Sequence, residues 1–166
     1  VAWKHALLSR ERPSALALTR QTLKELPKSK AQNMNINKGG YVVFESSNKP
    51  DGIIIASGSE VSIALQAAMD LKDKDLDIRV ISMPCQELYE RQTAAYKNKC
   101  IPKNFDNILA VESGKGQSWF RYIGKKGSMI TMESFGLSGT GNDVMRYFGF
   151  TVTNIKKQMQ KLIKRK

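Results

Sequence analysis

The stretch Gly52-Ile53-Ile54-Ile55-Ala56-Ser57-Gly58-Ser59-Glu60 decides the fold class. Its first five residues offer no polar side chain on either face, which is typical of a strand that is covered on both sides of a sheet. The Ser-Gly-Ser-Glu turn leads into residues 61–71, where apolar side chains recur at helical spacing. A buried strand that runs into an amphipathic helix predicts one unit of an α/β domain with a mainly parallel sheet.

The same alternation of strands and helices continues along the chain. Short apolar runs predict strands, and longer segments with helical spacing predict helices. The expected strands are residues 41–44, 52–56, 78–83, 108–111 and 129–132; the expected helices are 61–71, 86–97, 117–123, 143–148 and a C-terminal helix with the apolar stripe Ile155, Met159, Leu162 and Ile163. We find no internal repeat.

The N-terminal part has a different character. Residues 1–11 pattern as a helix that ends before Pro13, and residues 15–19 predict a short buried strand that delivers Arg20. A chain that opens inside a helix suggests a piece of a longer protein. Lys, Asn and Ser then dominate without apolar periodicity, which indicates a linker. We therefore expect the end of a preceding domain at 1–23, a linker at 24–37 and a complete domain at 38–166.

The chain is basic, and half of its excess charge lies at one end. Its 166 residues include 27 Lys and Arg against 15 Asp and Glu, a net charge of +12. Six of these charges belong to residues 156–166. One interpretation is binding to nucleic acid or an anionic membrane. The other, which we favour, is a docked terminal helix with a solvated lysine-rich face, because cations stabilise a helix C-terminus and no nucleic-acid-binding motif accompanies the charge.

Composition also bears on the cellular compartment of the protein. The apolar runs are far shorter than the roughly 20 residues that span a bilayer, and no secretory signal pattern is present. Cys85 and Cys100 form neither a disulfide framework nor a four-ligand zinc set. We expect a cytoplasmic protein with no membrane or nucleic-acid partner.

Few residues offer catalytic chemistry. His5 is the single histidine, and no spacing typical of a metal site occurs.

The acidic residues at 70–77 are interleaved with lysines, as in a solvated helix end. The turn at 57–60 reads as a capping box with Ser57 and Glu60, and the turn at 139–143 reads as a helix entry. Gly114-Lys115-Gly116 lacks the spacing of a P-loop. We expect no catalytic, cofactor-binding or metal-binding residue in this chain.

Arg20 has two interpretations. Its guanidinium offers a planar fork of donors that fits a phosphate group. The alternative is an ion pair at a surface or between domains, and spacing alone favours that alternative.

Five motifs follow one another along the chain: Ser14-Ala15-Leu16-Ala17-Leu18-Thr19-Arg20-Gln21, Ile55-Ala56-Ser57-Gly58-Ser59-Glu60-Val61, Val80-Ile81-Ser82-Met83-Pro84, Arg91-Gln92-Thr93-Ala94-Ala95-Tyr96 and Phe148-Gly149-Phe150-Thr151-Val152. In this order they resemble the transketolase family, and together they cover essentially the whole chain. The sequence departs from the family pattern at Ser138-Gly139-Thr140-Gly141, where the family usually has an Ala-Pro pair, and at Cys85, where a small hydroxyl residue is common.

The resemblance implies transfer of a two-carbon ketol unit from a ketose phosphate to an aldose phosphate by a homodimer that uses thiamine diphosphate and Mg²⁺. The family's cofactor ligands precede this chain, so the chain alone would be inactive. By its match to the Leu-Thr-Arg-Gln motif, Arg20 would bind the terminal phosphate of the sugar. Residues 38–166 would form a three-layer α/β/α domain with a five-stranded mixed sheet, 41–44 being antiparallel. The alternative function is a free-standing interaction or regulatory module without catalysis.

Overall fold

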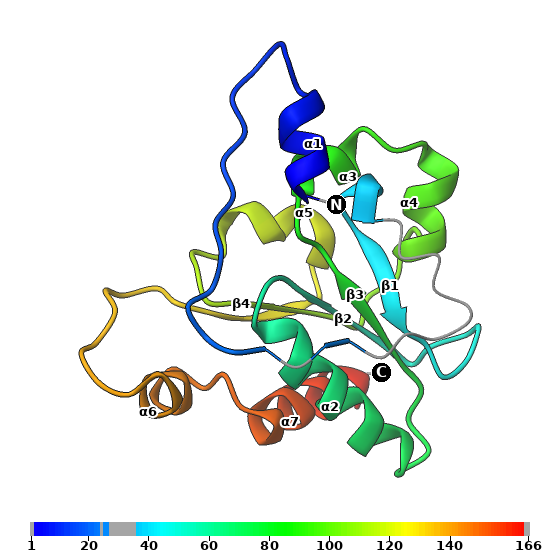
Figure 1. Ribbon diagram of the computed structural model, residues 1–166. Coiled ribbons are helices and arrows are strands. Elements are labelled where there is room, and N and C mark those ends of the chain that lie inside the picture. Colours follow the sequence, from blue (N-terminus) through cyan, green and yellow to red (C-terminus); the bar gives the residue numbers. More distant parts are fainter. Residues whose placement is uncertain (1, 24, 27–35, 165–166) are drawn as a thin grey trace.

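The computed structural model describes residues 2–23, 25–26 and 36–164, and its centre is a five-stranded sheet (Figure 1). The strand order is β1-β3-β2-β4-β5. β2 pairs in parallel with β3 and β4, β4 pairs in parallel with β5, and β1 lies antiparallel to β3 at one edge. The mixed, mostly parallel sheet is therefore confirmed. The strands are β1 Tyr41–Phe44, β2 Gly52–Ala56, β3 Ile78–Ser82, β4 Ile108–Glu112 and β5 Ser128–Thr131.

Helices cover both faces of the sheet and make three layers. One face packs against α2 (Glu60–Lys72) and α7 (Val152–Ile163). The other face packs against α3 (Gln86–Glu90), α4 (Ala94–Cys100) and α5 (Phe120–Ile123), as Figure 1 shows. Side chains alternate along a strand, so Ile54 joins the first core and Ile53 and Ile55 join the second, all at 0% exposure.

Three predicted helices differ from the structure in detail. The expected helix at 86–97 is two helices, because Thr93 has extended backbone and its Oγ1 accepts a hydrogen bond from Tyr96 N (3.2 Å) as the N-cap of α4. The expected helix at 117–123 begins as the 3₁₀ turn η2 (Gln117–Trp119) before α5. The helix expected at 143–148 is α6 (Gly141–Tyr147), which begins two residues earlier.

The N-terminal segment is the least like its prediction. It begins with α1 (Ala2–Leu8) and continues as an irregular arm along the domain (Figure 1). The strand expected at 15–19 is absent, because a strand requires a hydrogen-bonding neighbour and these residues have none within the described chain. Most of the expected linker lies outside the described residues, apart from 25–26 and the 3₁₀ turn η1 (Ile36–Lys38). None of the described helices has the length and apolar character needed to cross a bilayer.

Candidate functional site

Arg20 lies in a bend of the exposed N-terminal arm. The bend is held locally, because Gln21 N donates a hydrogen bond to Thr19 Oγ1 (3.2 Å). Among the described residues the guanidinium has no ion-pair or hydrogen-bond partner, so the ion-pair interpretation gains no support from this part of the chain. The phosphate-binding role stays a prediction.

The chain order of the sheet reverses between β2 and β4, and their carboxyl ends lie side by side at this point. Open α/β sheets take ligands in the crevice at such a point. Here Glu112 occupies it: Ser57 Oγ donates to Glu112 Oε2 (2.7 Å), and Gly114 N donates to Glu112 Oε1 (3.0 Å). A carboxylate of this chain therefore uses the donors that a bound anion would need.

Glu60 adds a second carboxyl group to the same crevice. Its residue is 2% exposed, and Ser59 Oγ donates to its Oε1 (2.7 Å). Burial raises the pKa of Glu60, and the neighbouring Glu112 raises it further. The predicted capping box is wrong in detail, since the Ser57 hydroxyl bonds Glu112 and helix α2 has Ser59 as its N-cap without a side-chain cap bond. This cluster ties two loops together and disfavours an anionic ligand.

The remaining candidates from the sequence have structural roles. The turn at 139–143 is a helix entry as predicted: Thr140 Oγ1 accepts from Asp143 N (3.3 Å) and donates to Asp143 Oδ2 (2.7 Å). His5 Nε2 lies 2.9 Å from Asn37 Oδ1, which ties α1 to η1. Burial raises the pKa of the Cys100 thiol, which lowers its reactivity.

The acidic residues at 70–77 and the neighbouring Asp51 take part in an ion pair and a hydrogen bond. In the cluster at 70–77, Asp70 Oδ2 pairs with Lys156 Nζ of α7 (2.5 Å), and Asp77 N donates to Asp51 Oδ2 (3.0 Å). Within residues 2–23, 25–26 and 36–164, no group of three or more His, Cys, Asp or Glu side chains is arranged to hold a metal ion.

Two features of the structure escaped the sequence analysis. Arg79 is 6% exposed within the apolar strand β3 and pairs with Glu45. The sequence feature that could have revealed this ion pair is a single charged residue within an apolar strand. A basic groove also opens beside α3, α4 and α5, and its residues are too scattered along the chain for any spacing to have revealed it.

Comparison with known proteins places the described domain in context. A family model for the transketolase-like TK C-terminal domain matches residues 39–151. Transketolase 1 of Vibrio vulnificus is 39% identical over 163 residues, which cover 98% of this chain and 24% of that protein. Transketolase of Aquifex aeolicus is 40% identical over 155 residues, covering 93% of this chain and 22% of that protein.

A solved structure gives the same result. The transketolase from Leishmania mexicana superposes with a TM-score of 0.87 at 34% sequence identity, covering 99% of this chain and 23% of that one. The chain thus spans about a quarter of the length of the curated relatives that it matches.

Proposed function

The chain belongs to the transketolase family, and we propose that it is the C-terminal part of an enzyme that transfers a two-carbon ketol unit from a ketose phosphate to an aldose phosphate. The observation that carries this proposal is the agreement of sequence and fold over nearly the whole chain, since 98% of it aligns with a transketolase at 39% identity. Its relatives are transferases.

The described residues support a structural role for this chain and leave cofactor binding to other parts of the enzyme. The sheet domain has a complete core on both faces, but its carboxyl-end crevice is filled by Glu60 and Glu112. In the proposed enzyme, thiamine diphosphate and Mg²⁺ are bound by other parts of the protein, where the cofactor supplies the carbanion chemistry. We propose that residues 38–166 support a cytoplasmic homodimer and that the 166-residue chain alone has no activity.

The N-terminal arm supports this arrangement. Several of its large apolar side chains are exposed to solvent: Trp3 is 68% exposed, Leu7 76% and Leu18 75%. Apolar side chains of this size are normally covered. Their exposure agrees with packing against a further domain of a longer enzyme. In that setting Arg20, at the end of the arm, would contact the terminal phosphate of the sugar.

The role of Arg20 can be tested by replacing it in the enzyme that contains this chain. The Arg20→Ala variant should lose about ten-fold or more in kcat/KM with phosphorylated sugars, since a charged hydrogen bond to phosphate contributes about 1.5–3 kcal/mol. An unphosphorylated ketol donor should be used almost as well as before. Arg12→Ala is the matched control, because Arg12 is an exposed arginine of the same arm. Equal loss with both kinds of donor would remove the phosphate role.

A further inference from the structure

The segment between β5 and the first turn of α6 is exposed and carries no charge. Residues 134–142 contain no acidic or basic side chain, in a chain of which 25% is charged, and all of them are exposed. Phe135 is 97% exposed and Leu137 51%, and Tyr147 of α6 follows at 74%. Aromatic residues and few charges are typical of the core of a protein–protein interface. We call residues 134–142 and Tyr147 the β5–α6 surface.

The β5–α6 surface is anchored to the domain at both ends. At its start, Lys115 Nζ donates a hydrogen bond to the carbonyl oxygen of Glu133 (2.7 Å). At its end, Thr140 is the N-cap of α6, and Met145 of that helix packs against the core between the sheet and α2 and α7. The exposed apolar side chains therefore belong to a segment that the domain holds in place.

The N-terminal arm reaches the domain on the same side. Figure 1 shows the arm descending past the left of the sheet, the side from which the loop between β5 and α6 also projects. The arm has exposed apolar side chains of its own, among them Leu18 at 75%. The family model that matches residues 39–151 describes a C-terminal domain, and the chain spans about a quarter of its curated relatives. The proposed enzyme thus has a further domain that enters through the arm, beside the β5–α6 surface.

We propose that the β5–α6 surface docks against the domain to which the arm belongs in the longer enzyme. Phe135 and Leu137 lie at the centre of this contact with Tyr147 beside them, and the charged residues Glu133 and Arg146 lie at its border. Docking is favourable because it removes apolar surface from water. The contact fixes the position of the sheet domain relative to the arm. This inference rests on the proposed function, since it requires the longer enzyme.

Hydroxyl-radical footprinting with mass spectrometry tests the proposal, because the oxidation rate of an aromatic side chain follows its accessibility to solvent. The 166-residue chain is compared with the longer enzyme that contains it. Phe135 should oxidise readily in the 166-residue chain, where it is 97% exposed. In the longer enzyme its rate should fall about five-fold or more, and that of Tyr147 should fall with it, since the core of an interface excludes water.

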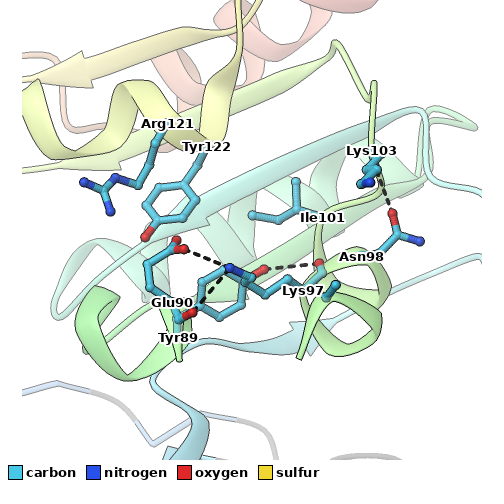
Figure 2. Close-up of a pocket in the computed structure, with 9 residues that line it drawn as sticks. Tyr89, Glu90, Lys97, Asn98, Ile101, Lys103, Arg121 and Tyr122 are labelled. Carbon is cyan, nitrogen blue, oxygen red and sulfur yellow. Dashed lines mark hydrogen bonds and ion pairs between the residues drawn. The ribbon is translucent and has the colours of Figure 1, made fainter. Parts of the chain in front are cut away.

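Phe120 is the matched control for Phe135. It is 61% exposed on α5, on the other side of the sheet. That side also carries the basic groove, which Lys97, Lys103 and Arg121 line (Figure 2). Its charged character differs from that of the β5–α6 surface, so Phe120 should oxidise at the same rate in both proteins. An equal fall at Phe120 would overturn the assignment of the contact to the β5–α6 surface.

A double variant tests whether the apolar side chains make the contact. In the longer enzyme, Phe135→Ser with Leu137→Ser should raise the oxidation rate of Tyr147 to its value in the 166-residue chain, whereas Phe120→Ser should leave it low. Both replaced side chains are exposed, so the fold should tolerate the change. Continued protection of Tyr147 in the double variant would overturn the proposal.

Two further outcomes separate this inference from its alternatives. If Phe135 became protected in the 166-residue chain as its concentration rose, the surface would bind a second copy, and the proposal would be overturned. Ketol transfer is measured on the same samples. An active longer enzyme in which Phe135 oxidises freely would overturn this inference alone, and a protected Phe135 in a longer enzyme without transfer activity would overturn the proposed function alone.

Discussion

Replacing Arg79 should destabilise the domain more than any surface arginine does. Arg79 lies on β3 and joins three parts of the chain. Its Nε donates to Glu45 Oε1 (2.9 Å), and Nη2 makes an ion pair with the same carboxylate. Its Nη1 donates to the carbonyl oxygens of Lys99 and Cys100 (3.0 Å each). These two carbonyls end helix α4, where the backbone has no intrahelical donor.

The magnitude follows from what each substitution leaves unpaired. In Arg79→Met, two helix-end carbonyls lose their donor, whereas the Glu45 side chain is 30% exposed and can be hydrated. With a charged hydrogen bond contributing about 1.5–3 kcal/mol and such terms not adding fully, we expect a loss of about 3 kcal/mol. Glu45→Gln keeps an acceptor for the guanidinium and should cost about 1–2 kcal/mol. At about 2–4 °C per kcal/mol, Arg79→Met should lower Tm by about 6–12 °C.

Urea unfolding followed by tryptophan fluorescence measures these differences. Trp119 is 2% exposed and packs edge to face with Tyr122, so its emission reports on the side of the sheet that Arg79 supports. Arg146→Met, at an exposed position of α6, is the control and should stay within about 0.5 kcal/mol of the wild type. An Arg79→Met variant as stable as this control would show that the hydrogen bonds of Arg79 to the end of α4 do not stabilise the domain.

Two further predictions concern a buried carboxyl group and a pair of glycines. Because burial raises the pKa of Glu60 above its ordinary 4.5, the folded state loses stability as pH rises through the raised value. Glu60→Gln should therefore show a higher Tm than the wild type at pH 7 and no advantage below pH 4.5; a gain independent of pH would contradict this. Gly39 and Gly58 both have positive φ (79° and 52°), but only at Gly39 would a Cβ overlap backbone, at Cys85 O and Tyr89 N. In urea unfolding Gly58→Ala should cost about 1–2 kcal/mol and Gly39→Ala distinctly more, and equal losses would exclude the overlap as a cause.

The central strands could be predicted from the sequence, because burial on both faces requires several apolar residues in a row. The predicted ranges 41–44 and 52–56 coincide with β1 and β2, and every residue of β2 is buried. A strand covered by helices on both sides must be apolar at successive positions, so five residues suffice to identify it. The layer order follows from the alternation of strands and helices.

The polar contacts could not be predicted from the sequence, because their partners are far apart in the chain. Arg79 meets Glu45 across 34 positions and Lys99 across 20. Ser57 reaches Glu112 across 55 positions, which is why the local capping box was the simpler but wrong interpretation. The basic groove combines residues from 89 to 122 that only the packing of three short helices brings together.

The N-terminal arm shows the converse case, in which local sequence describes an environment that the described chain does not supply. Residues 15–19 are apolar enough to predict a buried strand, yet Leu18 is 75% exposed and no strand pairs there. The same holds for Trp3 and Leu7 on α1. A strand obtains its hydrogen bonds and its burial from neighbours, whereas the domain from residue 38 onward supplies both from its own elements. This difference is the physical argument behind the proposal that the arm packs against a further domain, and the Arg20→Ala experiment tests the phosphate contact that the same proposal assigns to the arm.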